Sequence, residues 1–129
     1  MAPTRGRGMG EFRGGVAEIN ITPPIGLSLC GFGDRKGPAE DIFDDLYARA
    51  LVIEEGDVSV CIVTSDVISF APDLVQRIRR MVEQDTGIPG SHFVLSASHS
   101  HSGPTVMSFR SMGSRDPNYE DVLCRKVVS

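Results

Sequence analysis

Two apolar runs rich in β-branched residues occupy the middle of the chain, and they restrict its fold more than any other feature. Residues 46–54 and 58–67 are separated only by Glu55-Gly56-Asp57, a short polar segment that contains a glycine. This arrangement predicts a β-hairpin. The second run is almost continuously apolar, which is typical of a central strand that is covered on both faces.

A helix and a further strand follow the hairpin. Pro72 can open a helix over residues 72–85, whose apolar side chains recur on one face, and Gly87 suits its C-cap. The other expected elements are strands over residues 15–21 and 92–98 and a second amphipathic helix over residues 119–128. We therefore predict an α/β fold with a mixed sheet and crossover helices.

The order of these elements places polar residues at two strand ends. The strand over residues 92–98 can run parallel to the strand over residues 58–67, because a helix connects them. Ligands gather beyond the carboxyl ends of such strands. Asp66 and His99 both lie at those ends, so we expect them to face one crevice, although an Asp there can also simply cap a turn.

Two histidines stand directly after the last predicted strand. Residues two apart in an extended backbone point to the same face, so His99 and His101 can converge on one pocket. Paired imidazoles suit zinc, but a zinc site needs three or four ligands, and loop histidines are often only solvated. Ser102 is a candidate nucleophile, although adjacent residues rarely form a working Ser-His pair.

Several separated segments together resemble the N-terminal domain of the neutral/alkaline ceramidases, which are zinc-dependent amidases. The similarity runs from residue 14 to about residue 107, in the family's order. The matching pieces are Gly-Val-Ala at 15–17, Ile-Thr-Pro-Pro-Ile-Gly at 21–26, Gly-Phe-Gly at 31–33, Asp-Leu-Tyr-Ala-Arg-Ala-Leu-Val-Ile-Glu at 45–54, Ser-Asp at 65–66, Thr-Gly-Ile-Pro at 86–89 and Ser-Ala-Ser-His-Ser-His-Ser-Gly-Pro at 96–104.

This resemblance implies hydrolysis of the N-acyl bond of ceramide or a related lipid amide, with Zn²⁺ as cofactor. It implies that His99 binds the zinc and that His101 lines the active site as a catalytic residue. Four further residues match family loops near the active site: Gly31, Gly33, Ser102 and Gly103. The family's other zinc ligands lie downstream, so residues 14–129 would be the incomplete N-terminal part of a larger domain, inactive alone.

Composition excludes several other classes. Thirteen basic and seventeen acidic residues give a net charge of -4, which favours neither nucleic acid nor an anionic membrane surface. The three cysteines, Cys30, Cys61 and Cys124, are widely spaced and are expected to be buried free thiols. No stretch approaches the ~20 apolar residues of a transmembrane helix, and no signal peptide is seen, although ceramidases are often secreted.

Three interpretations stay open at this point. Besides a ceramidase-like hydrolase, the chain can be a different metal hydrolase with a His-x-His strand, although in amidohydrolase barrels that motif lies on the first strand. It can also be a non-catalytic binding module on the same scaffold.

Two further predictions concern the start of the chain and its association. Residues 1–13, which are rich in Arg and Gly, are predicted to form a flexible leader. Exposed strand edges predict self-association.

Overall fold

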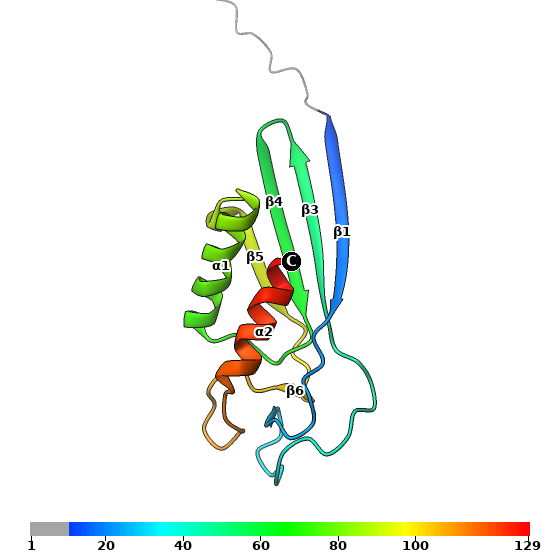
Figure 1. Cartoon of the computed structure of the whole chain (residues 1–129), viewed down its shortest axis with the longest axis vertical. Helices are drawn as coiled ribbons and strands as arrows, with labels where there is room; N and C mark the ends of the chain where they lie inside the picture. The colour runs from blue at the N-terminus through cyan, green and yellow to red at the C-terminus, as the bar shows by residue number, and fades with distance from the viewer. Residues whose placement is uncertain (1–10) are drawn as a thin grey trace, which may run out of the picture.

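A computed structural model describes residues 11–129 as a four-stranded mixed sheet with two helices on one of its faces (Figure 1). The strands lie in the order β1-β3-β4-β5. Their bounds are Phe12–Asn20 for β1, Tyr47–Glu55 for β3, Val58–Ser65 for β4 and Phe93–Ala97 for β5. The helices are α1, Pro72–Thr86, and α2, Pro117–Val128. The predicted α/β class with a mixed sheet is confirmed.

The hairpin and the crossover form as the sequence indicates. Strands β3 and β4 pair antiparallel, and Gly56 supplies the positive φ, 58°, that their tight turn requires. Strand β5 pairs parallel to β4. Helix α1 connects these two strands, with Pro72 in its first turn and Gly87 in the left-handed conformation at its C-cap.

Two elements begin earlier than predicted. Strand β1 begins at Phe12, three residues before the expected start, because its pairing with β3 continues up to Glu55 and outweighs the weak strand preference of Gly14 and Gly15. The predicted leader is thus wrong for residues 12–13, and residues 1–10 lie outside the described part. Helix α2 begins before Tyr119, since the Asp116 side chain caps it.

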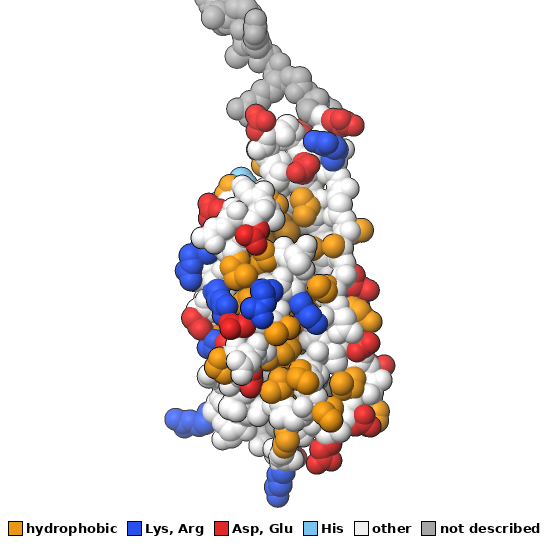
Figure 2. All heavy atoms as spheres, in the orientation of Figure 1, with side chains coloured by type: hydrophobic (Ala, Val, Ile, Leu, Met, Phe, Trp, Pro, Cys, Tyr) orange, Lys and Arg blue, Asp and Glu red, His pale blue; other side chains and the backbone are white. Residues whose placement is uncertain are grey.

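The core lies between the sheet and the two helices. Phe93 and Val63 on the sheet pack with Leu74 and Ile78 of α1 and with Leu123 of α2. Figure 2 looks onto this side of the molecule and shows hydrophobic side chains gathered beside the helices. No helix of residues 11–129 is long and apolar enough to span a membrane.

The opposite face of the sheet differs from expectation. Strand β4 was expected to be covered on both faces, but both helices lie on one face (Figure 1). On the other face, Val58 and Val94 are exposed, and Ile62 is only partly buried. The three cysteines are buried and free, as predicted.

Short elements that the sequence did not reveal organise the loops. Strands β2, Leu29–Cys30, and β6, Gly103–Pro104, form a separate two-stranded sheet, and a 3-10 turn, Gly90–His92, precedes β5. A pairing of two residues leaves no periodic pattern in a sequence. The pairing of β2 with β6 nevertheless brings the loop after β2 against the histidine segment, so that Gly31 lies next to His101.

Candidate functional site

His99 lies two residues beyond the end of β5, in a backbone conformation that few residues adopt. Its φ is +64°, in the left-handed region that non-glycine residues rarely enter. The backbone is held there by its N–H, which donates to the Val67 carbonyl at 3.1 Å, and by the neighbouring Ser98 N–H, which donates to the Ser65 carbonyl at 2.9 Å. Such strained residues cluster at functional sites.

The side chain of His99 is oriented by a second contact. Its Nδ1 lies 2.9 Å from the Ile68 carbonyl oxygen. Because a carbonyl oxygen only accepts hydrogen bonds, this contact assigns the ring proton to Nδ1. In the neutral ring, Nε2 then keeps a free lone pair, and this is the arrangement that metal-binding histidines commonly have.

Asp66 lies nearby, but its carboxylate is used to join strand ends. Oδ2 accepts from the Tyr47 N–H at 3.0 Å and from Arg49 Nη1 at 3.4 Å, and Oδ1 accepts from the Ser98 hydroxyl at 3.0 Å. Asp66 therefore contacts the residue directly before His99 and fixes the ends of β3 and β5. This favours a positioning role over metal ligation.

His101 belongs to a row of rings at the same edge. Its ring meets the His99 ring edge-on, with centroids 4.8 Å apart, and the Phe32 ring at 5.6 Å. The guanidinium of Arg35 lies over Phe32, 5.3 Å from the ring centroid, and Nη2 donates to the His101 carbonyl at 3.2 Å. Phe32 lies in the Gly-Phe-Gly segment that resembles a family loop, but no sequence pattern indicates that Phe32 or Arg35 contacts His101, because only the fold brings them together.

Two of the predicted glycines are required by close approaches. A Cβ on Gly31, whose φ is +126°, would lie 2.4 Å from His101 Cα, and a Cβ on Gly103 would lie 2.8 Å from the Asp66 carbonyl oxygen. Gly33 has no such contact; its nearest neighbour is a methionine side chain at 4.0 Å. Ser102 is exposed, and no hydrogen bond within residues 11–129 joins its hydroxyl to a histidine.

The side chains at this edge include one residue suited to bind zinc, His99, but they do not form a complete zinc site. Within residues 11–129, no group of three or more His, Cys, Asp or Glu side chains is placed to hold one ion. Cys30 is adjacent to Gly31, but burial raises the pKa of its thiol, and only the thiolate binds zinc well. Of the two histidines at this edge of the sheet, His99 is thus the one whose ring is oriented as in a metal ligand.

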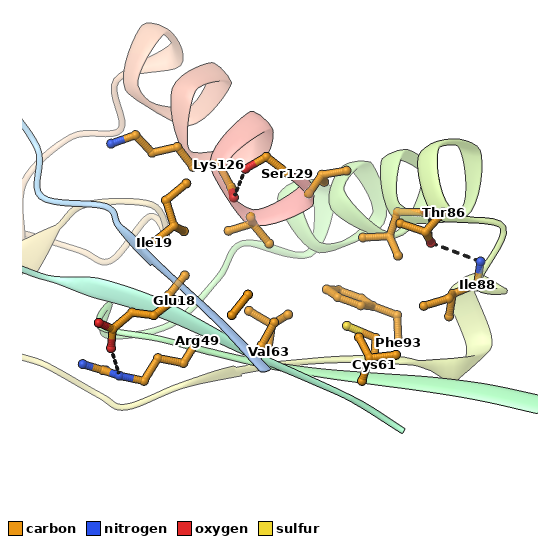
Figure 3. Close-up of a pocket in the computed structure, with 17 residues that line it drawn as sticks. Glu18, Ile19, Arg49, Cys61, Val63, Thr86, Ile88, Phe93, Lys126 and Ser129 are labelled. Atoms are coloured by element: carbon orange, nitrogen blue, oxygen red, sulfur yellow. Dashed lines mark hydrogen bonds and ion pairs between the residues drawn. The ribbon is translucent and has the colours of Figure 1, made fainter. Parts of the chain in front are cut away.

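A separate hollow of about 370 Å³ lies on the helix side of the sheet (Figure 3). Its walls are mostly apolar and come from β1, β3, β4, the start of β5 and the last turns of both helices. Cys61, Val63 and Phe93 are among the lining residues. None of the predicted site residues lines it, so it is distinct from the histidine pair.

Comparison with known proteins gives a fold likeness. No protein-family model matches the chain. The crystal structure of neutral ceramidase from Pseudomonas aeruginosa superposes with a TM-score of 0.74 at 19% sequence identity, and a structure described as ceramidase complexed with C2 superposes with a TM-score of 0.68 at 21% identity. Each match covers 92% of this chain and 20% of the other. The chain therefore has the fold of about one fifth of a ceramidase chain.

Proposed function

We propose that this chain is part of a zinc-dependent amidohydrolase that cleaves the N-acyl bond of ceramide or a related lipid amide. The observation that carries the proposal is the His99 side chain, which is held at the carboxyl edge of the sheet with Nδ1 bonded to a carbonyl and Nε2 left for a metal. The fold likeness to ceramidase structures supports it independently.

The described residues would have separate roles in this reaction. Zinc, when bound, supplies a Lewis acid that polarises an amide carbonyl and makes water nucleophilic near neutral pH. His99 would hold the ion, and the Ile68 carbonyl would keep its ring in position. His101, which packs between His99 and Phe32, would donate a hydrogen bond to the developing oxyanion from a fixed position. Asp66 would maintain the strand ends that carry them.

Metal analysis of matched histidine variants tests the zinc assignment. We expect His99→Ala to lose most of the bound zinc and His101→Ala to keep most of it, because, of these two rings, only that of His99 is oriented by a contact between Nδ1 and a carbonyl. His92→Ala serves as the control, since the His92 ring contacts the Ser59 carbonyl at the far end of β4. Full zinc retention by His99→Ala would refute the assignment.

A non-catalytic binding module is the second candidate, and one observation favours it. No third ligand is placed beside His99 within residues 11–129, and a catalytic zinc site needs about three protein ligands. We therefore expect the 129-residue chain to show no turnover of a fluorescent N-acyl-sphingosine above background, with micromolar zinc added. Turnover that depends on zinc and on His99 would show that the other ligands come from a rearrangement of this chain or from a second copy of it.

A further inference from the structure

The loop after β2 presents one arginine beside the histidine pair in a fixed position. The Arg35 N–H donates to the Phe32 carbonyl at 3.2 Å and closes a tight turn. The side chain folds back over the Phe32 ring, and Nη2 donates to the His101 carbonyl at 3.2 Å. Backbone, ring and carbonyl together orient this guanidinium.

Among residues 11–129, Arg35 forms no ion pair, a property that it shares with Arg79, Arg80, Arg110 and Arg125; of these five, it is the one whose guanidinium is held by a hydrogen bond, to the His101 carbonyl. Every ion pair in the described part of the chain involves one of four other arginines: Arg13, Arg49, Arg77 and Arg115. No Asp or Glu oxygen among residues 11–129 lies within 4.0 Å of the Arg35 guanidinium nitrogens. A guanidinium has five N–H donors, so the single bond to His101 leaves most of them available.

The position of this cation relates it to the candidate site. Phe32 contacts both the Arg35 guanidinium and the His101 ring, and His101 contacts His99. Arg35 therefore belongs to the same continuous row of side chains as the proposed zinc ligand. A ligand whose amide reached His99 and that continued along this row would meet the guanidinium.

We propose that Arg35 determines specificity by binding a carboxylate that the substrate carries near its scissile amide. A planar guanidinium matches a carboxylate through two parallel hydrogen bonds, and stacking on an aromatic ring fixes its plane without reducing its charge. The inference rests on the proposed function, because it takes the histidine pair as the place where the amide binds. It points to N-acyl amino acids, since ceramide has no carboxylate.

Binding of two matched amides to the 129-residue chain tests this without turnover and without added zinc. The probes are N-hexanoylglycine, which carries a carboxylate, and N-hexanoylethanolamine, which is neutral and of similar size, each titrated by calorimetry. We expect the acid to bind about tenfold more tightly, as one charge-assisted pair can provide. Arg35→Gln should abolish the preference, and Arg35→Lys, which keeps the charge but not the fork, should retain part of it.

Lys36→Gln is the matched control, because it removes one positive charge from the neighbouring residue of the same loop. It should leave the tenfold preference unchanged. Equal binding of the two amides by the wild type, a preference that survives Arg35→Gln, or an equal loss in Lys36→Gln would each overturn the proposal. If the acid preference depends on Arg35 while His99→Ala keeps its zinc, then the metal assignment fails and the Arg35 site stands.

Discussion

Both faces of the sheet carry apolar residues, but the two faces have opposite environments. In β5, Phe93 is 1% exposed and the next residue, Val94, is 49% exposed. Val94 belongs to a transverse row of apolar side chains on all four strands: Val16, Leu51, Ile62 and Val94, joined by the strand registers. The helices cover one face, and no described helix covers the other (Figure 1). Apolar sequence therefore identifies surfaces that need covering, and only the fold tells which ones are covered here.

The outer face also changes character along its length. The next row towards the site consists of Glu18, Arg49, Thr64 and Ser96, in which Arg49 pairs with Glu18 at 2.6 Å. The apolar row thus lies on the hairpin side, and the polar row lies next to Asp66 and the histidine segment. The exposed apolar row and the histidine segment therefore lie towards different ends of the same sheet.

The largest effect should come from the covered face. Phe93→Ala removes a fully buried ring that packs beneath the helices, so we expect the free energy of unfolding to fall by about 3–5 kcal/mol. Denaturant unfolding measures this change. Val94→Ala, the adjacent residue on the exposed face, is the control. A loss for Val94→Ala as large as that for Phe93→Ala would show that the outer face is covered too.

An intermediate effect on stability should follow from removing the arginine that links the two helices. Arg115 bonds both to Asp73 of α1 and to the buried carboxylate of Glu120 in α2. Arg115→Gln leaves Glu120 without its cation, which we expect to cost about 1–3 kcal/mol. Arg125→Gln, on the exposed side of α2, is the control and should change stability little.

The ion pair between Arg115 and Asp73 leads to a prediction about how stability depends on pH. The Arg115 side chain, through its hydrogen bond, lowers the pKa of Asp73 below its ordinary value. A carboxyl whose pKa is lowered by folding contributes stability above its unfolded pKa, and that contribution is lost as pH falls through the folded pKa. The difference in stability between wild type and Arg115→Gln should therefore shrink in acid. A difference that is constant from neutral pH to pH 3 would contradict this account of the pair.

The smallest effect on stability should come from the exposed row. We expect Val16→Thr combined with Leu51→Thr to change the free energy of unfolding by less than about 0.5 kcal/mol, because both side chains contact solvent. The same variant should reduce self-association, since it makes the apolar row polar. Sedimentation over a concentration series measures this. A wild-type chain that stays monomeric at high concentration would contradict the prediction that this face drives self-association.

The sequence predicted the main architecture because its signals are local. The hairpin follows from two runs and one glycine, and α1 follows from Pro72, an apolar stripe and Gly87. Pairs such as β2 with β6 join residues far apart in the chain, and so does the contact of Arg35 with His101. Such contacts depend on where the fold places each loop, so the motif predicted His99 and His101 but not the aromatic and cationic residues around them.

The hydrogen bonds of His99 have a consequence for the order in which the molecule assembles. Its N–H and its ring both bond to residues just after β4, about thirty positions earlier in the chain. These bonds can form only after the parallel pairing of β4 with β5, and parallel pairing is slow because a long loop must first close. The histidine pair should therefore acquire its geometry late in folding, and a newly made or partly unfolded chain would present two ordinary imidazoles with little affinity for a metal.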